Sequence, residues 1–505
     1  MSSQAPAVSD LKKVYSLNID TQAQRYSRLV EAFKAAYRAR PDFIARAPGR
    51  VNIIGEHIDY CGFPVFPMAI APDTLIAARA NGTDRVRVAN IDGERYPAHD
   101  FSAASEIFDI DSTVHEWSNY FKCGYRGIFD YLDRRDGKGL DALLDGTVPA
   151  GGGLSSSAAF VCATELVVQR VNGVGLSQNE LASIAAGAER YVGVNSGGMD
   201  QTASIMGQQG SALFIEFHPK LQATPVKLPE SSPPLVFVIA NTLVVSDKHV
   251  TAPVCYNLRV VETRIGALIL ARYLDIADRP ACKNVDPLTF KIVMDEYFSG
   301  KDTAGRSDVE VWIERLEAML AASGKAFGGR PDGYTREQMA AELGVSVQEL
   351  SDKVHESQFP VRAERFQLLK RAQHVFSETL RVVRFRQICE QEKSADTSDS
   401  DVGRELGALM NQSQDSCRDQ FECSCKELDE LCTIARNAGS LGSRLTGAGW
   451  GGCSVHLVYQ DKVDAVKKAL VQAYYARRHP QLSAEQLDSA LFATAPGCGA
   501  CYYDE

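Results

Sequence analysis

The sequence lacks the excess of positive charge that binding to nucleic acid requires. Its 505 residues carry 54 Lys and Arg against 64 Asp and Glu, which gives a formal net charge of −10. A protein that neutralises the phosphates of a nucleic acid needs a basic face, so we do not expect nucleic acid as a partner. The acidic balance is modest, and it still permits a local cationic pocket for a small anionic ligand.

Long apolar runs and a secretory leader are also missing. The longest apolar stretch, around Leu235 to Val245, is interrupted by Asn241 and Thr242 and is too short to span a bilayer. Residues Met1 to Ala7 contain neither the basic nor the apolar region of a signal peptide. We therefore expect a cytoplasmic protein with no membrane partner.

The cysteines do not follow a zinc pattern. There are 13 of them, an odd number, and neither Cys423-Ser-Cys425 nor Cys498-Gly-Ala-Cys501 has a second pair at zinc-finger spacing. In a reducing compartment a cysteine usually behaves as a small buried hydrophobic residue. We expect structural thiols and neither disulfides nor a zinc site.

Two familiar kinase signatures are absent, and so are internal repeats and coiled-coil heptads. The sequence contains no G-x-x-x-x-G-K-[ST] loop and lacks the H-R-D and D-F-G elements of protein kinases. Strand and helix patterns are mixed in both halves, which favours an α+β protein with two lobes. The Pro-rich stretch 228–234 is the expected boundary. The predicted units are an N-terminal extension and helix (1–40), a first domain (41–230) and a second domain (235–505).

The hydrophobic patterns predict individual elements. Leu29, Val30, Phe33 and Tyr37 are spaced for one face of a helix. Helices are also predicted over 155–171 and over most of 258–390, and loops at 323–333, 394–401 and 442–452. Strands are predicted at 43–55 (with a break at Pro48-Gly49), 75–80, 85–89, 140–148, 212–217, 235–240 and 453–459.

What the sequence does contain is glycine between a strand and a helix, in Pro149-Ala-Gly-Gly-Gly-Leu-Ser-Ser-Ser-Ala158. Glycines let backbone N–H groups approach a ligand closely, and the start of the following helix offers unpaired donors and a positive dipole end. This arrangement suits phosphate, and serine oxygens there suit phosphate or Mg²⁺. A plain glycine turn with a serine N-cap is the open alternative.

A second glycine-rich segment, Gly447-Ala-Gly-Trp-Gly-Gly452, matches G-x-G-x-x-G in letters. A dinucleotide site needs that motif between a strand and a helix, whereas here a strand follows. This order disfavours an oxidoreductase. The segment is then either a loop that lets a backbone approach a ligand or a tight turn.

Ionisable residues are concentrated in Arg50-Val-Asn-Ile-Ile-Gly-Glu-His-Ile-Asp-Tyr60. Carboxylates and an imidazole hydrogen-bond adjacent hydroxyls well, and arginine offsets phosphate charge, so the segment suits a sugar. A solvated surface loop is the alternative. In Gly197-Gly-Met-Asp-Gln201, two glycines would let Asp200 be held at a crowded site.

Together these segments resemble the GHMP kinase superfamily, and most closely the fungal galactokinases. Residues 46–60 look like the galactokinase signature, 151–158 the phosphate loop and 445–453 the third, glycine-rich motif. Further similarity runs through 237–246, 251–261, His374-Val-Phe-Ser-Glu and Phe421-Glu-Cys-Ser-Cys. The resemblance covers the chain from about residue 40 onward, apart from 390–402. It implies a two-lobed fold with the active site between the lobes.

The resemblance also implies roles for individual residues. The implied catalytic residues are Asp200, as base, and Arg50, which would face the transferred phosphoryl group and the sugar. The implied galactose-binding residues are Glu56, His57, Asp59, Gly198 and Tyr256. The implied ATP-binding residues are Gly151, Gly152, Gly153, Ser155, Ser156, Ser157, Trp117, Tyr120 and Asn241. Ser157 and Glu189 match the Mg²⁺-ligand positions.

The implied reaction is phosphorylation of galactose by ATP at the anomeric hydroxyl. Relatives with the same motifs act on N-acetylgalactosamine or arabinose, and some fungal relatives are galactose and ATP sensors that relieve a transcriptional repressor. Sensors typically lose residues of the phosphate loop, whereas Ser155-Ser-Ser-Ala-Ala159 is intact, which favours the enzyme. A repressor partner stays open, and a monomer is expected.

Overall fold

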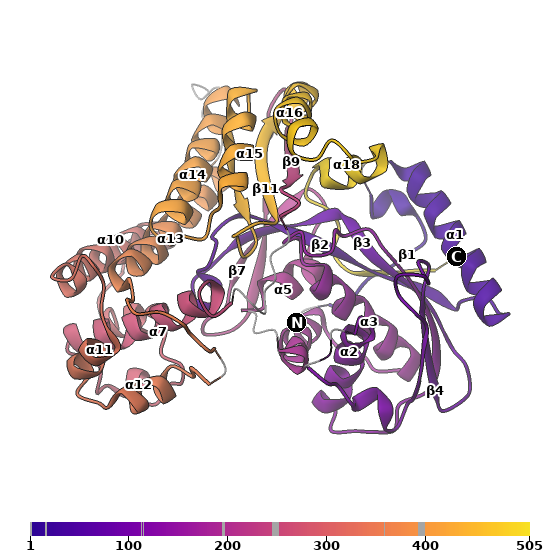
Figure 1. The fold of residues 1–505 in the computed structure, drawn as a ribbon, viewed down its shortest axis with the longest axis horizontal. Helices are drawn as coiled ribbons and strands as arrows, with labels where there is room; N and C mark the ends of the chain where they lie inside the picture. Colours follow the sequence, from indigo (N-terminus) through magenta and orange to yellow (C-terminus); the bar gives the residue numbers. More distant parts are fainter. Residues whose placement is uncertain are drawn as a thin grey trace.

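The computed structural model describes residues 3–15, 18–112, 114, 116–193, 197–244, 252–357, 359–391 and 399–504. It confirms a mixed α and β architecture, in which the described residues form sheets of seven, four and two strands (Figure 1). No described helix is both long and apolar enough to cross a bilayer. All thirteen cysteines are unpaired.

A seven-stranded sheet forms the N-terminal lobe. Its strands, in spatial order, are β1 (Ala7–Val8), β13 (Cys501–Tyr503), β2 (Phe43–Ile54), β3 (Phe66–Ala80), β6 (Leu140–Gly146), β4 (Arg85–Asn90) and β5 (His99–Ser102). Most neighbours are antiparallel, but β4 pairs with β6 and β1 with β13 in parallel. The central strands β2, β3 and β6 therefore supply the rigid frame beneath the candidate site.

Both faces of this sheet are covered, because alternate residues of its central strands are apolar on each side. Ile44 and Leu75 pack under α1 (Ile19–Tyr37), whereas Ala45 and Ile76 face the opposite helices. The helices of that opposite layer are α2 (Ser118–Tyr131), α3 (Ser156–Asn172), α4 (Gln178–Ala188) and α5 (Met199–Met206). The predicted helix around Phe33 and the predicted helix that follows the phosphate loop are confirmed as α1 and α3.

The expected break at Pro48-Gly49 does not end its strand. β2 continues to Ile54, with register shifts against β3 between Pro48 and Arg50 and again between Asn52 and Ile54. Such bulges bend a strand and redirect its side chains. The backbone N–H of Arg50 donates instead to the carbonyl of Leu154, 3.1 Å away. The break is therefore a bend that brings β2 against the phosphate loop.

The C-terminal lobe contains a four-stranded antiparallel sheet. Its order is β10 (Gly442–Thr446), β11 (Cys453–Tyr459), β9 (Leu235–Asn241) and β12 (Leu491–Thr494). Val238 and Leu431 belong to the core on one face, which α15 (Lys426–Asn437) and α16 (Val463–Leu470) cover. Helix α14 (Asp399–Asp419) packs along β10. The first half of the glycine-rich stretch 442–452, for which no strand was predicted, is thus the strand β10.

The remaining helices form a layer that lies at the left of Figure 1. They are α7 (Tyr256–Tyr273), α8 (Pro280–Lys283), α9 (Phe290–Tyr297), α10 (Asp308–Phe327), α11 (Arg336–Leu343), α12 (Val347–Lys353) and α13 (Leu368–Glu390). The short helices α17 (Ala476–Arg478) and α18 (Ala484–Ala490) and the hairpin β7 (Ser211–Glu216) and β8 (Gln222–Lys227) complete the fold. The predicted loop at 323–333 is helical up to Phe327. Of the predicted loop 394–401, residues 394–398 lie outside the described ranges, and α14 already includes Asp399.

One hydrophobic core joins the two lobes. It runs from Val51 and Ile53 of β2 to Val375 and Phe376 of α13. The Pro-rich stretch 228–234 separates β8 from β9, and the chain returns to the first sheet at β13, which pairs with Ile44 to Arg46. The end of the chain therefore belongs spatially to the N-terminal lobe.

Candidate active site

The predicted phosphate loop lies between β6 and α3. Ser155 is the N-cap of α3 with a left-handed backbone (φ 61°), and its side chain makes no capping hydrogen bond. Its Oγ is buried and has no hydrogen-bond partner among the described residues. The first N–H groups of a helix have no partner within the helix. The loop therefore presents N–H donors that an oxyanion could engage, and Ser155, although it is the N-cap residue, does not occupy them with its side chain.

The second glycine-rich segment, the β10–β11 turn, lies directly against this loop. A Cβ at Gly447 would stand 2.7 Å from the carbonyl oxygen of Gly153, and one at Gly452 would stand 3.2 Å from that of Gly152. Because the two backbones touch, side chains are excluded from the contact. The glycines are therefore needed for the packing of one loop on the other, and the dinucleotide interpretation is excluded by the antiparallel pairing of β10 and β11.

Arg50 connects the phosphate loop to the predicted base. Its Nε donates to Oδ1 of Asp200 at 2.7 Å, and its Nη1 donates to the carbonyl of Gly153, also at 2.7 Å. Arg50 is buried, whereas the side chain of Asp200 is 25% exposed. Asp200 lies in the first turn of α5, whose N-cap Gly198 has φ +94°. One guanidinium thus fixes a reachable carboxylate beside the phosphate loop.

Asp59 and Tyr256 lie on the same side of the site. Asp59 packs so tightly against Gly197 that a Cβ there would overlap its carboxylate. Burial, together with the charge of Asp200, raises the pKa of Asp59 to about 7. The ring of Tyr256, at the start of α7, lies edge-on to that of Tyr60 at 5.7 Å between centroids. The structure therefore brings Asp59, Asp200 and Tyr256 near one another from three separate elements.

Glu56 uses both carboxylate oxygens within the protein. Oε2 pairs with Arg444 at 2.7 Å and accepts from Asn52, and Oε1 accepts from the backbone N–H of Gly447 at 2.9 Å. This side chain therefore holds the β10–β11 turn against the predicted sugar-binding segment.

His57 likewise contacts the β10–β11 turn. Its Nε2 lies 2.9 Å from the carbonyl of Ala448, and its Nδ1 lies 3.1 Å from the hydroxyl of Tyr60. Burial lowers the pKa of His57 to about 3, so the ring is neutral, Nε2 donates to Ala448 and the Tyr60 hydroxyl donates to Nδ1. A role for Glu56 and His57 in binding galactose stays a prediction.

The candidate nucleotide and metal residues surround α3. Trp117 stacks on Phe160 of α3 with centroids 6.0 Å apart, and Tyr120 lies 6.5 Å from the same ring. The Asn241 amide lies next to Gly152, since a Cβ there would be 3.1 Å from Nδ2. Gly151, Ser156 and Ser157 lie in the loop and first turn, and the buried Glu189 accepts a hydrogen bond from Gln201.

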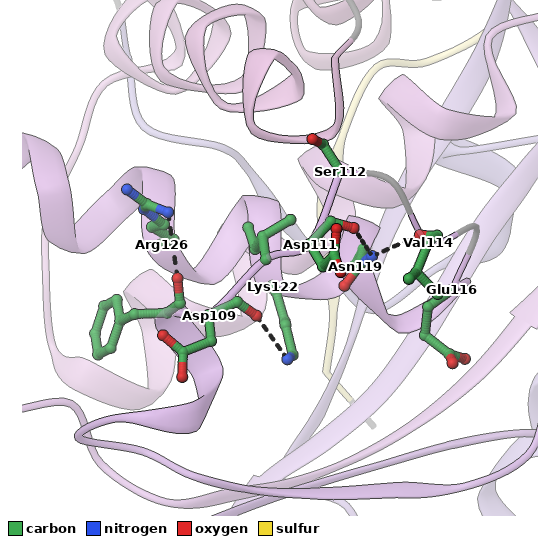
Figure 2. Close-up of a pocket in the computed structure, with 10 residues that line it drawn as sticks. Asp109, Asp111, Ser112, Val114, Glu116, Asn119, Lys122 and Arg126 are labelled. Atoms are coloured by element: carbon green, nitrogen blue, oxygen red, sulfur yellow. Dashed lines mark hydrogen bonds between the residues drawn. The ribbon is translucent and has the colours of Figure 1, made fainter. Parts of the chain in front are cut away.

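A shallow depression of about 690 Å³ lies between α2 and the segment that precedes it (Figure 2). On its floor, side chains of α2 hold the preceding loop: Asn119 donates to the carbonyl of Asp111, Lys122 to that of Asp109 and Arg126 to that of Phe108. The described residues that line it include none from the phosphate loop or from 50–60. This depression is therefore distinct from the Arg50–Asp200 pair.

Sequence reasoning gave no role to several residues that support the site. Arg444 pairs with Glu56, and His374 and Glu378 of α13 contact the backbone of Glu56 and Gly55. The segment His374-Val-Phe-Ser-Glu was noted for its similarity only. The signal available in it was the spacing of four, which places two polar side chains on one face of a helix.

The fold and the two glycine loops define a kinase of the GHMP superfamily. A model described as GHMP kinases N terminal domain matches residues 119–208, and one described as GHMP kinases C terminal matches 401–477. A third, the galactokinase galactose-binding signature, matches residues 31–80.

The curated and structural relatives narrow the class. The chain is 39% identical to a galactokinase of Saccharomyces cerevisiae over 95% of both chains, and 41% identical to one of Candida parapsilosis over 94% of both. It also resembles the crystal structure of Lactococcus lactis galactokinase complexed with galactose, with a TM-score of 0.65 and 25% identity over 94% of this chain and 99% of that one. The chain belongs to the galactokinase family. The predicted enzyme class is thereby confirmed.

Proposed function

We propose that this site transfers the γ-phosphoryl group of ATP to the anomeric hydroxyl of α-D-galactose, which gives galactose 1-phosphate and ADP. The observation that supports it is Arg50, whose guanidinium binds both Asp200 and the carbonyl of Gly153 at 2.7 Å. A hydroxyl beside Asp200 and a phosphoryl group on the loop would meet at that cation.

The chemistry needs positioning and charge stabilisation above all, because phosphoryl transfer passes through a loose transition state. Asp200 would either accept the proton of the sugar hydroxyl or orient the sugar through a hydrogen bond from that hydroxyl. The N–H groups at the start of α3 and the positive end of its dipole would stabilise charge on the phosphate oxygens. Arg50 would stabilise the charge on the group in transfer.

Galactose would lie between Asp59, Asp200, Gly198 and Tyr256, with Glu56 and His57 completing the segment. ATP would lie along Gly151–Ser157, with its base toward Trp117 and Tyr120 and with Asn241 beside its phosphates. These placements rest on the family resemblance and on the proximity described above.

The oxygen donors of Ser157 and Glu189 fit Mg²⁺, since this ion prefers hydroxyl and carboxylate oxygens together with phosphates. The side chain of Glu189 is buried beside α3, with 1% of its surface exposed, and a carboxylate in such a place needs a compensating cation or proton. When bound, Mg²⁺ would neutralise charge on the nucleotide phosphates.

We also propose two lobes at 41–230 and 235–505 behind the N-terminal extension, and the cytoplasm as the location.

A coupled assay of ADP release tests the proposal with galactose, N-acetylgalactosamine, arabinose, glucose and mevalonate. We expect galactose to be favoured over N-acetylgalactosamine by about 10² or more in kcat/KM, because an acetamido group must find room beside the Tyr256 hydroxyl. Tyr256→Phe should narrow that ratio, whereas Tyr273→Phe, at the exposed far end of the same helix, should leave it unchanged. Equal use of the two sugars by the unaltered protein would contradict the proposal.

A further inference from the structure

Two side chains of α13 contact the backbone of the predicted sugar-binding segment. His374 and Glu378 are one helical turn apart and fully buried, and they point to the same place. His374 Nε2 lies 3.0 Å from the carbonyl of Glu56, and Glu378 Oε1 accepts from the N–H of Gly55 at 2.9 Å. Neither side chain belongs to the site that the motifs predict.

The protonation states of both are set by their surroundings. A carbonyl can only accept, so Nε2 of His374 carries the proton, and burial keeps the ring neutral. Nδ1 lies 2.8 Å from the Ser416 hydroxyl, which is also within hydrogen-bond distance of Oε1 of Gln420. Burial would raise the pKa of Glu378, but the Arg381 and Arg444 guanidinium groups lower it to about 2. Each group therefore offers one fixed donor or acceptor to the segment.

The segment that they hold has a backbone that needs support. Gly55 has φ +107° and His57 has φ +62°, a left-handed conformation that is unfavourable for a side chain with a Cβ. Such unfavourable backbone conformations persist where many contacts with the surrounding structure hold them in place. Arg444 adds two bonds, from Nη1 to the carbonyls of Asn52 and Ile53 at 3.0 and 3.3 Å. Backbone groups from Asn52 to Glu56 are thus fixed from the other lobe.

In the sequence, this held segment lies between Arg50 and Asp59. Both of these residues lie near Asp200 in the structure. A displacement of the Gly55–Glu56 backbone would shift Asp59 relative to Asp200. It would reach the phosphate loop only indirectly, through the Glu56 carboxylate and the β10–β11 turn, and that loop is also held by Arg50. The larger effect should therefore fall on the sugar.

We propose that His374 and Glu378 are positioning residues for galactose, which fix the Gly55–Glu56 backbone so that Asp59 faces Asp200. This inference rests on the proposed function. It assigns a role to the segment His374-Val-Phe-Ser-Glu that no motif gave it.

The test compares His374→Leu, which removes the donor, with His374→Gln, whose amide can still donate to the Glu56 carbonyl. Steady-state kinetics give KM for galactose and for ATP separately, and calorimetry gives the affinity for galactose alone. We expect His374→Leu to raise the galactose KM about 10- to 100-fold, as displacements of an ångström or less do. KM for ATP should rise much less than KM for galactose, and His374→Gln should restore most of the loss.

Thr379→Val is the matched control. Thr379 is equally buried on the same helix, but among the described residues its hydroxyl bonds to the carbonyl of Val375 within α13 and to nothing in the segment 52–56. It should lower thermal stability without changing the galactose KM. If His374→Leu does not fold, Ser416→Ala and Glu378→Gln take its place. Ser416→Ala removes the partner of Nδ1 that helps to orient the His374 ring, and it should raise the galactose KM a few-fold. Glu378→Gln keeps an oxygen that can accept from the N–H of Gly55, so it should raise the galactose KM less than His374→Leu does.

The outcomes separate the two claims. An unaltered protein that does not phosphorylate galactose would refute the proposed function. An active protein whose His374 and Ser416 variants lose stability or kcat, with an unchanged galactose KM as in Thr379→Val, would overturn the positioning role.

Discussion

Gly447 tests how strongly the phosphate loop depends on the β10–β11 turn. In Gly447→Ala the new Cβ would stand 2.7 Å from the carbonyl oxygen of Gly153, with no side chain that could give way. An ordinary carbon–oxygen contact is about 3.3 Å or more, so Gly153 must move by roughly 0.5 Å. That oxygen accepts from Arg50 at 2.7 Å, so the movement is passed to the Arg50–Asp200 pair.

The size of the effect follows from these contacts. A misplacement of about 1 Å at a reacting centre costs on the order of 10² in rate, so about half of that should lower kcat/KM by roughly 10-fold or more. The left-handed backbone, with φ +88°, adds about 1–2 kcal/mol of instability once a side chain is present.

Gly173→Ala is the matched control for this strain. Gly173 ends α3 with φ +68°, and a Cβ there would meet no atom within 4 Å. Both variants should melt at lower temperature, whereas only Gly447→Ala should lose activity in the coupled ADP assay. Equal kcat/KM values for the two variants, each measured on the folded fraction, would refute the inferred dependence.

Three further outcomes are expected at carboxylates. Asp200→Asn should lower kcat by at least about 10²–10⁴, with nucleotide affinity retained in a binding titration; turnover near that of the unaltered protein would rule out a base. The pKa of Asp59 is raised to about 7, whereas that of an unfolded aspartate is roughly 3.9. Between these two pH values the native protein keeps a proton on Asp59 that the unfolded chain has lost, so the free energy of unfolding falls as the pH rises across that window. The melting temperature of Asp59→Asn, measured relative to that of the unaltered protein, should therefore rise from pH 5 to pH 8. A difference that stays constant over this range would argue against the raised pKa of Asp59. Glu165 is fully buried in α3, burial and the neighbouring Glu189 raise its pKa, and neither oxygen has a hydrogen-bond partner among the described residues. Glu165→Met should stabilise the protein by about 1–3 kcal/mol in thermal melts, and a lower melting temperature would show that the carboxyl is stabilised in a way not seen here.

Local pattern was sufficient for elements whose burial is periodic. The apolar run at 235–240, the alternation at 453–459 and the helix after Ser155 were predicted nearly at their observed bounds, as β9, β11 and α3. Each carries enough apolar surface in the right period to define its own face. The phosphate loop and the order of motifs followed from glycine placement, which is also a local signal.

The misses depend on partners far away in the sequence. β10 reads Gly442-Ser-Arg-Leu-Thr446, which no strand pattern favours, but its polar side chains are buried with remote partners: Arg444 with Glu56, and Ser443 with His456. Similarly, Glu56 and His57 could be identified in the sequence as motif residues. The sequence could not predict that their polar atoms are bound to the β10–β11 turn. Which groups a charged side chain satisfies is decided by tertiary packing.

The strand β13 has a consequence for how the chain is made. Arg46 in β2 donates to the carbonyl of Cys498, 452 positions further along, and β13 then fills the edge of β2. At roughly 5–20 residues per second, a ribosome needs tens of seconds to synthesise the intervening chain, and until then that edge of β2 has no partner. Unpaired strand edges are templates for association with other chains. The nascent N-terminal lobe is therefore exposed to misassembly until translation has passed Tyr503, and a chain released before Cys501 keeps that edge open.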